Sequence, residues 1–286
     1  MIRIRRVKLP TSTTGNEAQR SSLSPRFAHA FVVALMFVLV ACVTETTGGF
    51  NAARSDAQAL KDYIQLATGY LDQRDLANAK RHLNNAGALD ANNSEVFALW
   101  GLVYSQEGEP ALADDSFERS LRINPRNSQA RNNYAAFLFA EDRFEDAYAQ
   151  LELVVEDTAY TGRPQAFENL GLAALRLQRI DDAEYAFGRA VQLDNNRLRS
   201  SLELAALFLQ KQDVLQARAY YRNYLTLLQF YNIAQNARGL WVGIQLEDAL
   251  GNDNNVEQYG TQLEASFRGS PEYQLYSQFL DTKDDE

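Results

Sequence analysis

The sequence predicts an all-α fold, a solenoid of about six helix–turn–helix units closed by a C-terminal capping helix. Three observations lead to this prediction. A pattern of small and bulky residues recurs about every 34 residues. Within each unit, apolar residues stand three and four positions apart, the period of an amphipathic helix. No segment alternates apolar and polar residues in the way that a half-buried strand would.

Two series of small residues set the register of the units. Both series have spacings of 34, 34, 36 and 34 residues: Ala67, Gly101, Ala135, Gly171 and Ala205, and Ala79, Ala113, Ala147, Ala183 and Ala217. A bulky residue stands four positions after each member of the second series, as Phe117 does after Ala113. We expect the small residues to let the two helices of a unit approach closely, while the bulky residues fill the space between them.

The second unit carries the most complete motif. Its Trp100-Gly101, Tyr104, Ala113, Phe117 and Pro125 resemble the tetratricopeptide pattern of a bulky residue with Gly, then Tyr, Ala, Phe and Pro. The resemblance implies a right-handed superhelix in which helix A of each repeat lines the inner face. The repeats are expected near 60–93, 94–127, 128–163, 164–197, 198–239 and 240–273, and together they make a repeat domain over 57–281.

Turn signals separate the expected helices in chain order. Inside the first three repeats they are Arg74-Asp75, Glu107–Pro110 and Glu141-Asp142. Runs rich in Asp, Asn and Pro end the first, second and fourth repeats, at 90–93, 124–127 and 194–196. The sixth repeat is degenerate and keeps only a few apolar positions and a proline of the pattern.

Two irregularities interrupt the period. The third repeat is two residues longer, around 157–164, and the interval from the fifth to the sixth is 42 residues. Because residues 220–231 contain no helix breaker, we expect an extended helix there, which either adds function or caps the solenoid. Residues 273–280 are expected to form the capping helix, and 282–286 a solvated acidic tail.

The first 41 residues have the pattern of a secretory signal. They hold six basic residues and one acidic residue, and their uncharged segment Ala30–Ala41 is too short to span a bilayer comfortably. Leu39-Val40-Ala41-Cys42 resembles a bacterial lipobox, which implies that lipid, including palmitate, is attached to Cys42. The alternative is a cysteine at the end of an ordinary anchor helix. Residues 42–56 then form a lipidated tether, and Val43 implies the outer membrane.

Composition weakens most catalytic and nucleic-acid functions. After residue 41 the chain holds 22 basic and 36 acidic residues, a net charge of −14, which argues against nucleic-acid binding. One cysteine and two histidines leave almost nothing for a metal site, and His82 has no partner histidine nearby. Acid pairs such as Asp114-Asp115 and Asp181-Asp182 point about 100° apart on a helix, so they are expected to be solvated charges. We therefore expect no enzyme, cofactor, metal or small-molecule substrate.

The expected function is binding through the inner groove. Positions one and four after each small residue of helix A should face this groove, and they are mostly apolar. Lys61 and Arg199 belong to repeats that are too far apart to form a carboxylate clamp. An apolar groove should take an apolar strand or an amphipathic helix, unless these side chains only pack helix A. The candidate partner-binding residues are Leu71, Leu102, Phe139, Leu172, Leu175 and Leu209.

A lipobox followed by about six tetratricopeptide repeats is similar to the PilF/PilW family of type IV pilus biogenesis lipoproteins. The most family-like stretches are 134–147, 167–174 and 239–250, of which the segment around Trp241 is the most distinctive. The resemblance implies a pilotin: a lipid-anchored protein of the Gram-negative outer membrane, facing the periplasm, that helps the pilus secretin localise and multimerise. The rivals are a tetratricopeptide lipoprotein scaffold for outer-membrane protein assembly or cell-wall enzymes, and a periplasmic enzyme with a repeat fold.

Overall fold

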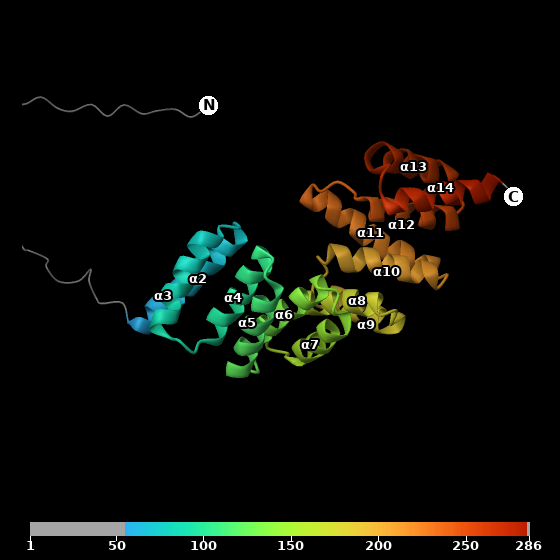
Figure 1. Ribbon diagram of the computed structural model, residues 1–286. Coiled ribbons are helices and arrows are strands. Elements are labelled where there is room, and N and C mark those ends of the chain that lie inside the picture. The colour runs from blue at the N-terminus through green and yellow to red at the C-terminus, as the bar shows by residue number, and fades with distance from the viewer. Residues whose placement is uncertain (1–54, 285–286) are drawn as a thin grey trace, which may run out of the picture. The chain divides into compact units, whose positions relative to one another are not determined.

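The computed structural model describes residues 55–284, and within them the chain is an all-α tetratricopeptide-repeat solenoid of thirteen helices with no strand (Figure 1). Six antiparallel pairs follow one another, and a single helix closes the C-terminal end. The pairs are α2 (Asp56–Asp72) with α3 (Leu76–Leu89), α4 (Ser94–Glu107) with α5 (Pro110–Ile123), α6 (Ser128–Ala140) with α7 (Phe144–Glu156), α8 (Arg163–Arg176) with α9 (Ile180–Leu193), α10 (Leu198–Gln210) with α11 (Val214–Tyr231), and α12 (Ala237–Ala249) with α13 (Asp253–Phe267); the closing helix is α14 (Pro271–Asp284).

The turn inside each pair has the same backbone geometry. One residue per turn adopts a left-handed conformation, with φ between 57° and 75° at Arg74, Gly108, Asp142, Gln178, Gln212 and Gly251. Asn232, with φ of 53°, has the same conformation but ends α11. The next residue donates its amide to a carbonyl five positions earlier, as Asp75 does to Tyr70 at 2.9 Å and Arg143 does to Leu138 at 2.9 Å. These bonds satisfy carbonyl groups at the end of helix A and direct the chain into helix B.

The small residues are packing positions, as the sequence predicts. All five alanines of the second series are fully buried, with 0% exposure. A Cβ atom built at Gly101 would lie 2.8 Å from the Phe117 ring, and one at Gly171 would lie 2.7 Å from the Phe187 ring. In these two repeats the glycine therefore gives a buried aromatic ring the room that it needs.

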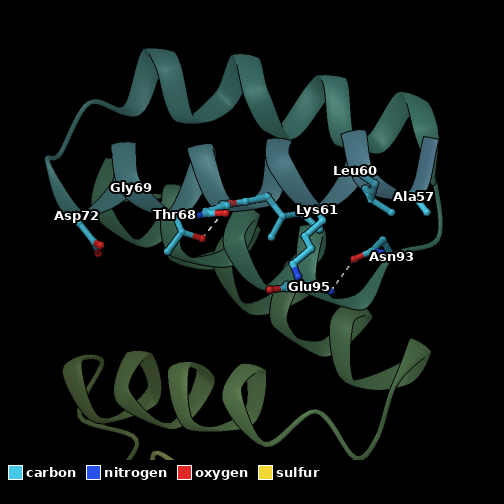
Figure 2. A pocket seen from close by; sticks show the side chains of 10 residues that line it. Ala57, Leu60, Lys61, Thr68, Gly69, Asp72, Asn93 and Glu95 are labelled. Carbon is cyan, nitrogen blue, oxygen red and sulfur yellow. Dashed lines mark hydrogen bonds between the residues drawn. The ribbon is translucent and has the colours of Figure 1, made fainter. Parts of the chain in front are cut away.

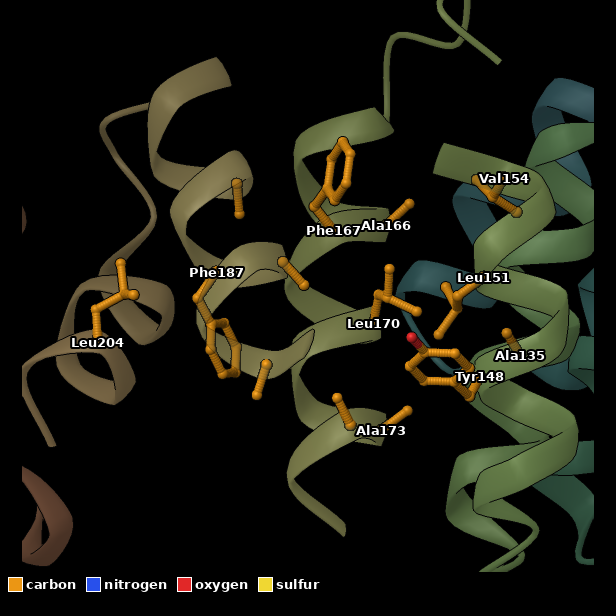
Figure 3. Close-up of a cluster of buried hydrophobic side chains, with 14 of the residues drawn as sticks. Ala135, Tyr148, Leu151, Val154, Ala166, Phe167, Leu170, Ala173, Phe187 and Leu204 are labelled. Atoms are coloured by element: carbon orange, nitrogen blue, oxygen red, sulfur yellow. The ribbon is translucent and has the colours of Figure 1, made fainter. Parts of the chain in front are cut away.

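The largest core cluster lies at the middle of the solenoid and spans α6 to α10 (Figure 3). Leu151 and Val154 of α7 pack toward Leu170 of α8, and Phe187 of α9 fills the next layer, beside Leu204 of α10. Since each repeat buries its apolar face against the following one, the pairs form a continuous core that no single pair could form by itself.

Both irregularities of the period have structural counterparts. The extra residues of the third repeat form the connection between α7 and α8, where Pro164 lies in the first turn of the new helix. The expected extended helix is confirmed, because α11 has 18 residues whereas α9 has 14. The expected capping helix is confirmed as α14, which is longer than the segment 273–280 that the sequence indicated. The first helix begins at Asp56, four residues before the expected start near Leu60.

The predicted leader, Cys42 and most of the tether lie outside the described residues, as do the last two residues of the acidic tail. Among the helices of the described part, none combines the length and the hydropathy needed to span a bilayer. The described residues, 55–284, belong to one compact unit, and five core clusters lie within them.

Candidate partner-binding groove

Three hollows lie along the face formed by the A helices and α14. The first-repeat pocket, of about 770 Å³, lies below α2 and reaches the start of α4. Figure 2 shows Leu60, Lys61 and Thr68 of α2 directed toward the same space as Asn93 and Glu95. Leu60 and Ile64 supply its apolar lining, while Lys61, Asp72 and Glu95 supply charge. No earlier described repeat covers this face of α2, so the pocket is open.

The N-terminal hollow, also of about 770 Å³, is formed by α2, α4 and α6 and by the turns that precede α6 and α8. Ala98, Leu99 and Leu102 line it together with Asp157 and Arg126. The Asp157 carboxylate accepts hydrogen bonds from Ser128 Oγ at 2.5 Å and from the Ala159 amide at 3.0 Å. These bonds, the Ser128 bond first, lower the pKa of Asp157 below its ordinary value, so it stays charged at neutral pH.

The C-terminal hollow, of about 750 Å³, has a mixed lining of apolar and polar side chains supplied by four helices. Leu175 of α8, Leu209 of α10 and Trp241 of α12 line it opposite Leu275 and Phe279 of α14. The amides of Gln210, Gln245 and Gln278 add uncharged hydrogen-bonding groups. The capping helix therefore forms a wall of this hollow as well as closing the solenoid.

Ion pairs neutralise the charged residues of the C-terminal hollow. Arg238 binds Glu203 at 2.9 Å, and Lys283 binds Asp248 at 2.5 Å. A charged ligand would have to compete with these pairs, whereas an uncharged apolar segment would leave them intact. The chemistry of this hollow therefore suits apolar side chains and backbone amides.

The structure brings some of the predicted groove residues together and separates others. Leu175 and Leu209 line the C-terminal hollow, and Leu102 lines the N-terminal hollow. Phe139 and Leu172 are partly buried, pack against the central core cluster and line none of the three hollows. Leu71 is only 4% exposed and packs inside the first core cluster, so its side chain does not face the groove.

Phe139 is enclosed by its neighbours. Its ring contacts the edge of Phe144 with centroids 5.2 Å apart, and the Arg176 guanidinium lies 5.8 Å from the Phe139 centroid and 3.9 Å from the Phe144 centroid. Arg176 also binds Asp142 at 3.3 Å. This cation–π cluster joins the third and fourth repeats, so a substitution of Phe139 would affect packing as well as any partner.

Sequence reasoning missed Trp241, Leu275 and Phe279 as groove residues. The last two lie on the capping helix, which the repeat pattern does not include. Lys61 lines the first-repeat pocket, whereas Arg199 is exposed and lines none of the three hollows. Asn133 accepts a hydrogen bond from Gln129 at 2.9 Å and also lines the N-terminal hollow.

His82 and Asp114, which could suggest a metal site or acid–base catalysis, pack against or bind neighbouring side chains. The His82 ring stacks on Tyr70 with centroids 5.3 Å apart, and no group of three potential metal ligands occurs among the described residues. Asp114 accepts from the Tyr134 hydroxyl at 2.7 Å and binds Arg143 at 3.0 Å. Burial, and then this bond to Asp114, raises the pKa of Tyr134. Asp114 therefore joins the second repeat to the third through these two contacts, and the prediction of a solvated charge is wrong for this residue.

Comparisons with known proteins agree with this architecture. The profile of the Tetratricopeptide repeat family matches residues 94–127. The type IV pilus assembly protein PilF of Pseudomonas aeruginosa is 34% identical over 250 residues, which cover 86% of this chain and 96% of that protein. A protein of Haemophilus influenzae is 29% identical over 161 residues, 56% of this chain and 88% of that protein.

Two solved structures resemble the solenoid. A structure of Pseudomonas aeruginosa PilF matches with a TM-score of 0.73 and 33% identity, over 78% of this chain and 98% of that one. The crystal structure of PilW, a widely conserved type IV pilus biogenesis factor, matches with a TM-score of 0.64 and 24% identity, over 76% of this chain and 98% of that one. At that identity, the likeness to PilW shows the fold alone.

Proposed function

Because the chain belongs to the PilF/PilW family of tetratricopeptide-repeat proteins, we propose that it acts in type IV pilus biogenesis as a pilotin, an outer-membrane lipoprotein that helps the pilus secretin localise and multimerise. The observation that carries this proposal is the 34% identity with PilF, a type IV pilus assembly protein, over 86% of the chain. The role is one of binding, with no reaction, cofactor or nucleic acid of its own.

The inner face supplies the surface for the secretin. In repeat order, Leu102, Phe139, Leu172, Leu175 and Leu209 would form its apolar contacts, with Leu102 in one hollow and the last two in another. An apolar strand or amphipathic helix of the secretin would remove these side chains from water, at about 25 cal/mol per Å² of apolar surface. The internally paired charges of the C-terminal hollow favour an uncharged segment there.

Lipid on Cys42 would hold this surface at the membrane. The support is the lipobox-like sequence 39–42 and the absence of any other cysteine in the chain. Cys42→Ser should leave an unprocessed precursor and remove the chain from the outer-membrane fraction. Normal processing and outer-membrane retention of that variant would contradict the anchor without bearing on the groove.

Deletion of the gene tests the pilotin role. The proposal expects secretin monomers to replace multimers on immunoblots and surface pili to disappear, with both restored by the wild-type gene. Normal secretin multimers in the deletion strain would refute it. Loss of outer-membrane proteins or cell-wall defects with intact multimers would instead indicate the alternative, a scaffold for outer-membrane protein assembly or cell-wall enzymes.

Complementation with groove variants tests the proposed surface. Leu209→Glu places a charge in the C-terminal hollow. Gln210→Glu also places a charge there, and because Gln210 is exposed this substitution should not disturb folding. Both should reduce secretin multimers while circular dichroism shows normal helix content. Leu153→Glu, at a leucine of α7 that is 51% exposed, is the matched control and should complement fully. Full complementation by both groove variants would place the contact elsewhere.

A further inference from the structure

The extended helix α11 has an exposed face that its packing leaves unused. At 100° per residue, Leu215, Arg218, Arg222, Thr226 and Phe230 fall within an arc of about 120°, and all five are exposed, Leu215 by 81%. The opposite side of the helix packs into the core through five buried residues, which are Ala217, Tyr221, Tyr224, Leu227 and Leu228. We call the exposed side the arginine–aromatic face.

An apolar tip ends this face where α11 runs past its neighbours (Figure 1). Phe230 is 77% exposed, Tyr231 46% and Ile233 53%, and the two aromatic rings meet edge to face with centroids 5.0 Å apart. Asn232 closes the helix in a left-handed conformation, and the Ile233 amide donates to the Leu228 carbonyl at 2.9 Å. The backbone therefore holds the tip outward in a fixed geometry.

The charge around this face differs from that of the rest of the chain. Residues 214–246 contain three arginines and no acidic residue, although the chain after residue 41 carries a net charge of −14. Arg238 binds Glu203, whereas Arg218 and Arg222 form no ion pair with any residue in the described part of the chain. Since salt screens charges beyond about 8 Å at physiological ionic strength, acidic residues that lie farther away than this do not cancel the charge of the two arginines.

We propose that the arginine–aromatic face contacts the surface of a phospholipid bilayer that contains anionic lipids. Arginine beside exposed aromatic and aliphatic side chains is the composition of segments that lie at a membrane interface. The tip projects from the solenoid and lines none of the three hollows, so it could insert into a deformable surface such as that of a lipid bilayer. The contact would orient the solenoid on the membrane, and it does not require lipid on Cys42.

The expected affinity is modest. Two arginines near an anionic surface strengthen binding about 30-fold. Tethering the chain to the vesicle adds effective concentration, so the contact should be measured on tethered protein. Residues 43–286 suit this experiment, because they contain the whole compact unit and no cysteine. A histidine tag at residue 43 can then hold the chain on vesicles that contain a nickel-chelating lipid.

A fluorophore at the tip reports the contact directly. Ile233→Cys labelled with the polarity-sensitive dye NBD should shift to the blue, and be quenched by bilayer-embedded quenchers, on vesicles of phosphatidylethanolamine and phosphatidylglycerol. The shift should be smaller on phosphatidylcholine alone. The same dye at Tyr185→Cys, a position of α9 that is 63% exposed, should remain in water on both vesicle types. A tip probe that stays in water on both would overturn the proposal.

Charge variants separate this face from general electrostatics. On the tethered protein, Arg218→Glu with Arg222→Glu should reduce the bilayer contact that the tip probe reports, because the affinity for the anionic vesicles should fall by about 30-fold or more. The control pair Arg74→Glu with Arg81→Glu makes the same change in net charge on the first repeat and should bind nearly as wild type. Equal losses in both pairs would refute a localised contact. A probe shift that grows with protein concentration in the absence of vesicles would assign the face to a second copy of the chain.

Discussion

Gly171→Ala should destabilise the solenoid, although alanine is the better helix former. A Cβ atom at this position of α8 would lie 2.7 Å from Cε1 of Phe187, closer than carbon atoms approach in folded proteins. Phe187 has 0% exposure in the central cluster, so its ring has no free space into which to move. Overpacking of this kind costs about 1–3 kcal/mol. Replacing a helical glycine by alanine returns about 1 kcal/mol, and the net loss should be about 1 kcal/mol.

A glycine in the neighbouring helix is the matched control. Gly188 lies inside α9, and a Cβ atom there would have no other atom within 4 Å. Gly188→Ala should therefore stabilise the protein by about 0.5–1 kcal/mol through its helix propensity alone. The two substitutions make the same chemical change in one helix pair, yet they should move stability in opposite directions.

Urea unfolding followed by circular dichroism measures the difference. The midpoint should fall for Gly171→Ala and rise for Gly188→Ala, with similar slopes. Phe187→Leu should cost less in the Gly171→Ala background than in the wild type, because the smaller side chain relieves the contact. If Gly171→Ala raised the midpoint as much as Gly188→Ala, the close packing between the A and B helices would not limit these positions.

Three further predictions concern other buried groups. Ala147→Leu should lower the thermal midpoint, because this fully buried alanine leaves no room for the added atoms and overpacking costs about 1–3 kcal/mol. Glu168→Ala should cost about 1–3 kcal/mol in urea unfolding, since the carboxylate accepts from the Ser200 amide at 3.2 Å and hydroxyl at 2.7 Å, whereas Glu152→Ala at an exposed position should change little. Burial raises the pKa of Tyr224 to about 12, so its stabilising contribution is complete below pH 10 and is lost as the pH rises toward 12. Other tyrosines with a raised pKa also titrate late, so the alkaline absorbance of Tyr224→Phe should differ from that of the wild type by the loss of one late-titrating tyrosine.

The repeat period was sufficient to predict the packing positions but only part of the groove. Leu71 and Leu175 both stand four residues after a small residue of helix A, yet Leu71 is buried among residues such as Val103, while Leu175 lines a hollow. The period identifies equivalent positions along the chain. Which neighbour covers each position depends on how far successive helices are displaced, and that displacement is set by side chains from several repeats.

The capping helix illustrates the same limit. The sequence predicted a helix near 273–280, but nothing in the repeat pattern indicated that Leu275 and Phe279 would face Leu209 across a hollow. Likewise, the acid pair at Asp114-Asp115 is expected to be solvated from helix geometry alone, whereas Asp114 meets Tyr134 and Arg143 from the next repeat. The spacing of residues within one repeat does not indicate which residues of another repeat they will contact.

The sequence by itself determined the all-α class, the repeat length, the buried alanines and glycines and the extended α11, because each follows from local periodicity and from the size of residues at fixed spacing. Only the tertiary structure decided which leucines face a hollow, which acids are ion-paired and which arginines remain unpaired. These depend on the angle and displacement between helices, a property that many side chains determine together.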